Sequence, residues 1–97
     1  MSLLKKKEPE VKDTKRLIGY LEVNHGFSYW FRYISGINWV SNRVTVKTTL
    51  DKREPVIANE INNALLIWAK DKSLEDKQIT RIVVLDNEAG EMIKQRL

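Results

Sequence analysis

Residues 43–50 alternate between polar and apolar side chains, apart from the polar Thr48. Successive side chains of a strand point to opposite faces of a sheet, so a period of two is typical of an antiparallel strand with one buried face. Val44, Val46 and Leu50 are predicted to point into the core. The intervening polar residues are predicted to point outward: Arg43, Thr45, Lys47 and Thr49. The chain is therefore expected to build a sheet with one covered face and one open face.

The segment from Glu54 to about Lys72 has the period of a helix. Its apolar residues follow the i, i+3, i+4, i+7 spacing of one helix face: Ile57, Ile61, Ala64, Leu65 and Trp68. Pro55 is tolerated in the first turn, where its missing N–H is not needed. Lys70 and Lys72 suit the negative end of the helix dipole. We expect one long helix that packs on one face of the sheet.

Two strands are predicted before residue 35. Residues 16–23 and 27–34 flank Asn24-His25-Gly26, and an Asn/Gly-containing connection supplies the positive φ that a tight hairpin needs. If Val23 pairs with Phe27, the inward side is the apolar one and carries Leu17, Leu21, Tyr29 and Phe31. The same register turns Tyr20, Trp30 and Arg32 toward the other side.

The remaining segments complete an α+β fold. Residues 35–38 are predicted to form a turn, residues 79–85 a central strand rich in β-branched residues, and residues 91–95 either a short edge strand or a terminal helical turn. The fold class is a mostly antiparallel sheet in the order βββαβ or βββαββ, with one long helix on one face. The predicted core consists of Leu17, Leu21, Val23, Tyr29, Phe31, Val44, Val46, Ile57, Ile61, Leu65, Trp68, Ile82 and Val84.

Length and composition restrict the architecture further. Ninety-seven residues are enough for one core and too few for two. Residues 1–13 are polar, lysine-rich and without period, so we expect a flexible basic N-terminal arm before a single α+β domain at residues 14–97. The absence of cysteine excludes a disulfide scaffold and favours a reducing compartment. With no signal peptide pattern and no apolar run near the length of a membrane span, we expect a cytoplasmic protein without a membrane partner.

The charge of the chain is unevenly distributed. Seventeen basic and thirteen acidic residues give a net charge of +4. Residues 1–16 carry six basic against three acidic residues, residues 17–50 three against one, and residues 51–97 eight against nine. This asymmetry indicates an anionic partner for the first half of the chain, although a lysine-rich tail that is simply solvated has the same composition.

The sequence offers little for catalysis. It has one histidine, no cysteine and only four glycines, without a Gly-rich phosphate loop. His25 is expected to serve a turn rather than act as a base or ligand. The acidic residues Asp86, Glu88 and Glu91 lack the spacing of an EF-hand loop and are interpreted as a solvated turn. We therefore expect no enzyme activity, no cofactor and no metal.

The predicted register gathers Tyr20, Trp30 and Arg32 with Arg43 and Lys47 on the sheet face away from the helix. Exposed aromatic rings stack on bases of any sequence, at about 1–3 kcal/mol per base, and neighbouring cations hold the phosphates. Lys5, Lys6 and Lys7 would add phosphate contacts from the arm. The sequence thus favours a non-catalytic module that binds nucleic acid, single-stranded or structured.

Two alternatives stay open at this point. Tyr20 and Trp30 also fit an ordinary cross-strand pair, or rings buried by the segment at Trp39. A face that mixes aromatic residues with arginine is also typical of protein interfaces, so the competing hypothesis is a protein-interaction module using the same face. Such a module would be an adaptor, an inhibitor or a homodimerising domain.

Overall fold

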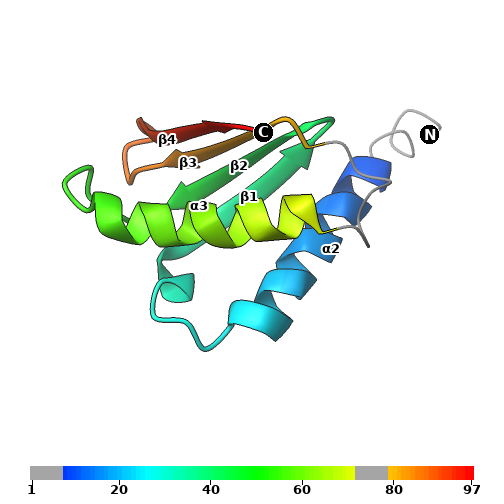
Figure 1. Cartoon of the computed structure of the whole chain (residues 1–97), viewed down its shortest axis with the longest axis horizontal. Coiled ribbons are helices and arrows are strands. Elements are labelled where there is room, and N and C mark those ends of the chain that lie inside the picture. Colours follow the sequence, from blue (N-terminus) through cyan, green and yellow to red (C-terminus); the bar gives the residue numbers. More distant parts are fainter. Residues whose placement is uncertain (1–7, 72–78) are drawn as a thin grey trace.

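The computed structural model describes residues 8–71 and 79–97 and is shown in Figure 1. The described residues form an α+β fold, as predicted, with two α-helices, one short 3-10 helix and a four-stranded sheet. The elements in chain order are α2 (Glu8–His25), η1 (Phe31–Tyr33), β1 (Ile34–Val40), β2 (Arg43–Thr48), α3 (Pro55–Lys70), β3 (Arg81–Leu85) and β4 (Glu91–Arg96).

The sheet is mixed and not mostly antiparallel, which corrects the predicted topology. Its strands lie in chain order, β1-β2-β3-β4. The pairs β1/β2 and β3/β4 are antiparallel, whereas the central pair β2/β3 is parallel. The parallel pair arises because α3 lies between the two strands and returns the chain to the end at which β2 began. The predicted order of three strands before a helix is therefore wrong.

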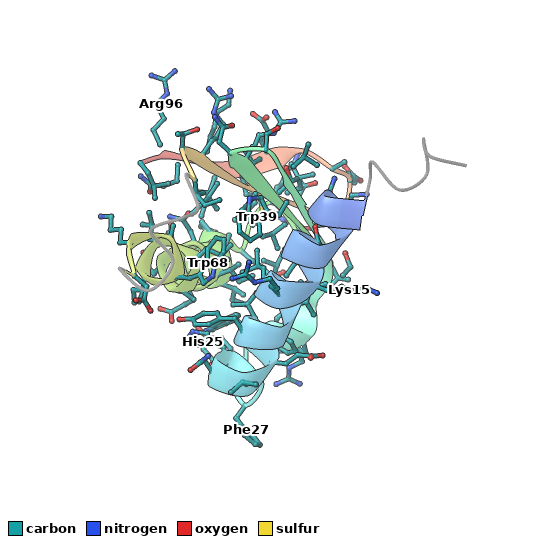
Figure 2. All side chains as sticks on the ribbon, turned by 90° about the vertical axis from the view of Figure 1, so that its right-hand side faces the viewer. Lys15, His25, Phe27, Trp39, Trp68 and Arg96 are labelled. Atoms are coloured by element: carbon teal, nitrogen blue, oxygen red, sulfur yellow. The ribbon has the colours of Figure 1, made fainter. Side chains whose placement is uncertain are left out.

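Both helices cover the same face of the sheet. Helix α2 contacts β1, and α3 contacts β3 and β4. Figure 1 shows the two helices on one side of the sheet, and Figure 2, turned by 90°, shows the same arrangement with the sheet above them. Among the described residues no element covers the opposite face, so the sheet has the one open face that the alternation of residues 43–50 predicts.

Residues 16–25, predicted to form a strand and a tight turn, are helical instead. Leu17 and Leu21 are buried in both readings, because residues four apart share a face in a helix and in a strand. The helix ends as Asn24 Nδ2 donates a hydrogen bond to the Tyr20 carbonyl at 2.9 Å and Gly26 N donates to the Glu22 carbonyl at 3.1 Å. The predicted hairpin of residues 16–34 therefore does not exist.

The first hairpin of the sheet lies further along the chain. Strand β1 contains the predicted turn at residues 35–38, which is extended and paired with β2. The actual turn is Ser41-Asn42, between the paired residues Val40 and Arg43. Ser41 adopts a positive φ of 55°, which suits the two-residue connection of a twisted hairpin.

The second half of the chain was predicted well. Strand β2, helix α3 and strand β3 occupy the expected segments, with Pro55 in the first turn of α3. Residues 91–96 form a strand, which decides between the two predicted alternatives. Residues 8–13 belong to α2, so the predicted arm overlaps this helix; residues 1–7 lie outside the described residues, and the predicted flexibility is not tested. Neither described helix is long and apolar enough to span a membrane.

The core lies between the sheet and the two helices. Nine predicted members are buried, Ile57 and Phe31 are partly buried, and Val23 and Tyr29 are exposed, the former by 80%. The exposure of Val23 follows from the helix, which turns this position away from the face of Leu17 and Leu21. Several buried residues were not in the predicted core: Trp30, Trp39, Leu50, Ala58, Ala64, Ile79 and Val83.

Trp39 connects the layers. Its ring meets Trp68 of α3 edge to face, with 4.9 Å between the ring centroids. Its backbone N–H donates to Thr14 Oγ1 of α2 at 3.1 Å, and its indole Nε1 donates to the Ser41 carbonyl at 3.0 Å. Figure 2 shows Trp39 below the sheet, between the two helices and above Trp68. This contact holds α2 against the edge strand β1.

Candidate functional site

The predicted aromatic platform does not form. Tyr20 lies on α2 and packs partly buried against the core. Trp30 is only 5% exposed and lies in the connection before η1, with its ring centroid 5.2 Å from that of His25. Arg32 is exposed on η1 and donates to the Tyr29 carbonyl at 3.3 Å. These three residues are therefore separated from the sheet face, because residues 16–34 are not the hairpin that would have carried them there.

Arg43 and Lys47 lie where the alternation placed them. Both are exposed on β2, and their buried neighbours Val44 and Val46 face the helices. The other three predicted binding residues, Lys5, Lys6 and Lys7, lie outside the described residues. Two of the eight predicted site residues thus remain on the open face of the sheet.

The register of the sheet adds cations from β3 and β4 to this face. Arg43 pairs with Arg81, and Arg81 pairs with Arg96, so the three arginines form one row across three strands. Paired residues lie on the same face, about 5 Å apart between neighbouring strands. Figure 2 shows Arg96 on the side of the sheet opposite both helices.

The next two rows carry the other cations of the open face. One row contains Thr45, Val83 and Lys94, and the following row contains Lys47, Leu85 and Glu91. We call the five cations of these three rows the basic sheet face: Arg43, Lys47, Arg81, Lys94 and Arg96. They come from β2 and from the β3–β4 hairpin, which are distant in sequence and lie side by side through the parallel pairing of β2 with β3.

Val83 shows how these side chains are arranged. It is only 4% exposed, yet it lies on the open face and is not part of the core cluster. With no helix over it among the described residues, its cover has to come from neighbouring side chains of the same face. Arginine and lysine extend their aliphatic stems along apolar surface and keep the charged group in water. The burial of Val83 fits a face on which such stems lie over apolar residues.

Most of these charges have no acidic partner. Lys94 Nζ lies 3.7 Å from Glu91 Oε1 on the same strand. Within residues 14–71 and 79–97, no carboxylate lies within ion-pair distance of Arg43, Lys47, Arg81 or Arg96. Like charges directly opposite each other on paired strands are destabilising, so we expect the row of arginines to cost stability in the free protein.

A pocket of about 530 Å³ lies at the end of the arginine row. Its lining includes all three arginines together with Ser41, Asn42 and Thr80. Backbone hydrogen bonds join two segments that line the pocket: the Asn42 carbonyl accepts from Thr80 N at 2.8 Å and from Arg81 N at 3.3 Å. The chain segments that carry the arginines are thus fastened to the Ser41-Asn42 turn.

Two acidic residues outside the basic sheet face, Asp86 and Asp51, have local structural roles. Asp86 Oδ1 accepts hydrogen bonds from the backbone N–H groups of Glu88 and Gly90, at 2.7 and 2.8 Å, and so shapes the β3–β4 turn. A side-chain hydrogen bond from Arg53 lowers the pKa of the partly exposed Asp51, away from the basic sheet face. The described part of the chain contains no group of three or more His, Cys, Asp or Glu residues that could hold a metal ion.

Arg81, Lys94 and Arg96 were missed by the sequence reasoning. Summed over residues 51–97, their charges are outweighed by nine acidic residues, so the second half of the chain looked neutral. The usable signal was position within a strand: Arg81 precedes the apolar Ile82-Val83-Val84 run, and Lys94 and Arg96 alternate along β4. Whether these residues lie beside Arg43 and Lys47 depends on the parallel pairing of β2 with β3, and no local sequence pattern predicts that pairing.

Comparisons of this chain with protein-family models, with curated proteins and with solved structures found no match.

Proposed function

We propose that this protein is a non-catalytic nucleic-acid-binding module that contacts the phosphate backbone with its basic sheet face. The observation that carries the proposal is the row of Arg43, Arg81 and Arg96, which lie side by side without an acidic partner among the described residues. A cost in stability at one surface is typical of a site whose partner supplies the missing charge.

The dimensions of the face suit a nucleic-acid backbone. Two strand spacings separate Arg43 from Arg96, about 10 Å, and four residues along β2 separate Arg43 from Lys47, about 13 Å. A duplex carries one negative charge per about 1.7 Å of helix axis, so an area of this size faces several phosphates. The planar guanidinium group of arginine also fits two oxygens of one phosphate.

The mode of binding differs from the one the sequence suggested. The three rows of the described sheet that form the open face carry no aromatic residue, so this face offers no platform for stacked bases. Phosphate contacts fix position but carry no direct sequence information. We propose binding that is independent of base sequence and does not require a single strand.

The competing hypothesis is a protein-interaction module that uses the same face. The cores of protein interfaces are enriched in both arginine and aromatic residues and depleted of lysine, whereas the three rows of this face combine arginine with lysine and carry no aromatic residue. The apolar residue at its centre, Val83, is already covered. Charge and burial therefore favour a polyanionic partner.

The proposal is tested by fluorescence anisotropy with end-labelled single-stranded and duplex oligonucleotides at about 50 mM salt. One variant replaces three exposed cations of the basic sheet face: Arg43→Gln, Lys47→Gln and Arg96→Gln. A matched control replaces three exposed lysines elsewhere: Lys15→Gln, Lys52→Gln and Lys70→Gln. Each variant removes three positive charges, so the two differ only in where the charge is lost.

We expect the face variant to bind about 10- to 100-fold more weakly than the wild type, at about 0.5–1 kcal/mol per exposed charge contact. The control variant should bind much more tightly than the face variant. Equal losses in both would show that net charge alone attracts the oligonucleotide. No binding by the wild type at this salt, together with light scattering that shows a stable dimer, would support the protein-interaction hypothesis instead.

A further inference from the structure

The pocket at the end of the arginine row differs from the rest of the basic sheet face. Elsewhere on this face the cations lie on separate rows, whereas here Arg43, Arg81 and Arg96 line one hollow. The Ser41-Asn42 turn and Thr80 border it, and Ser41 is exposed beside the arginines. Three guanidinium groups bring up to fifteen N–H donors to this place.

We infer that this pocket binds a terminal phosphate monoester of a nucleic acid, so that the protein prefers phosphorylated ends. This inference rests on the proposed function. A phosphate monoester carries a charge of about −1.5 to −2 at pH 7 and three strongly accepting oxygens, whereas an internal phosphodiester carries a single charge. A dianion therefore gains more than a diester from a hollow lined by three arginines.

The position of the pocket also suits an end of a strand. Lys47 and Arg43 lie along β2, and a backbone that follows them toward Arg43 reaches the hollow at the last row of the sheet. Beyond that row the chain turns at Ser41 and Asn42. The rows of single cations then hold internal phosphates, and the arginine row holds the terminal one.

Repulsion between the arginines of this row also favours a ligand that carries more than one negative charge on a single group. Arg81 and Arg96 are directly opposite on antiparallel strands, and none of the described carboxylates pairs with either. One dianion that contacts both guanidinium groups removes this repulsion at a single point. An internal phosphodiester, with about half the charge, offsets less of it.

The test compares three oligonucleotides of one sequence, with a 5′-phosphate, a 3′-phosphate or hydroxyl groups at both ends, each labelled internally. The wild-type protein is measured beside two double variants of the basic sheet face. One removes pocket arginines, Arg43→Gln with Arg96→Gln, and the other removes lysines outside the pocket, Lys47→Gln with Lys94→Gln. Circular dichroism checks that each variant is folded.

We expect the wild type to bind one phosphorylated form about tenfold or more tightly than the hydroxyl form, the effect of one added charge-assisted hydrogen bond. The arginine variant should lose this preference, and the lysine variant should keep it while binding all three forms more weakly. Equal wild-type affinities for the three forms, or a preference retained by the arginine variant, would overturn the inference and leave the proposed function intact. Failure of the wild type to bind any of them would overturn the proposed function.

Discussion

The salt dependence of binding is the sharpest quantitative consequence of the basic sheet face. Four of its cations have no acidic partner in the described residues: Arg43, Lys47, Arg81 and Arg96. If each neutralises one phosphate of a duplex that has hydroxyl groups at its ends, the slope of log K against log salt is about −3.6, at about −0.9 per contact. Raising the salt fourfold, from about 50 to 200 mM, should then weaken binding by about 150-fold.

Replacement of Arg43 by glutamine tests the predicted slope at one position. The variant retains three of the four contacts, so its slope should be about −2.7, and the same change in salt should weaken binding by only about 40-fold. Residues 1–7 can add contacts of their own, but these appear equally in wild type and variant. The difference of about 0.9 between the two slopes is therefore assigned to Arg43 alone.

The assay is an anisotropy titration of one labelled duplex at five or more salt concentrations, with wild type, Arg43→Gln and Lys15→Gln. Lys15 is exposed on α2, and Figure 2 shows it on the outer side of this helix. Its replacement should leave the slope unchanged. If Arg43→Gln has the slope of the wild type, or Lys15→Gln lowers the slope equally, phosphate contact by the basic sheet face is refuted.

Three further predictions concern the fold on which this surface depends. Leu21→Ala should lower the free energy of unfolding by about 2–5 kcal/mol, whereas Val23→Ala should change it by about 0.5 kcal/mol or less, because α2 buries the first side chain and exposes the second; urea denaturation measures both, and similar losses would contradict a helix here. Asn62→Leu should leave the free energy of unfolding unchanged or raise it by about 1 kcal/mol, because the buried Asn62 Oδ1 has no partner among the described residues. Gln95, which accepts a hydrogen bond from Asn62 Nδ2, is partly exposed and can bond to water in the variant. A loss above about 2 kcal/mol would show that the hydrogen bond between the two amides stabilises the fold more than the unpaired oxygen destabilises it. The three tryptophans are at most 5% exposed, so acrylamide should quench their emission weakly and oligonucleotides should leave it unchanged; strong quenching by bound oligonucleotide would restore the stacking mode.

The fold was predictable where the sequence shows one period without ambiguity. The alternation from Arg43 onward and the helical stripe through Ile61 each fit one element, and the structure has both. Between residues 16 and 25 the two periods coincide at Leu17 and Leu21, which share a face in either element. The Asn-His-Gly segment resembles a hairpin turn, but here its asparagine and glycine end a helix.

The site was predictable only where it depends on a single strand. Arg43 and Lys47 follow from the alternation within β2 and were placed correctly on the open face. Arg81 and Arg96 join them through the pairing of β2 with β3 and of β3 with β4. The crossover through α3 sets that pairing, and it brings Arg43 and Arg81 together across 38 positions of the chain. Local patterns contain no information on such a contact.

Protection of an uncovered sheet is the plainest alternative explanation for charges on this face. Natural sheets use charged side chains to prevent association with other molecules, and lysine is common in this role. Protection alone is served as well by charges of both signs, which attract each other across neighbouring strands and add stability. This face instead has arginine opposite arginine at the end of three strands, with its one carboxylate, Glu91, paired to Lys94. A surface under selection for solubility alone has no reason to keep that repulsion, whereas a surface that receives phosphates does.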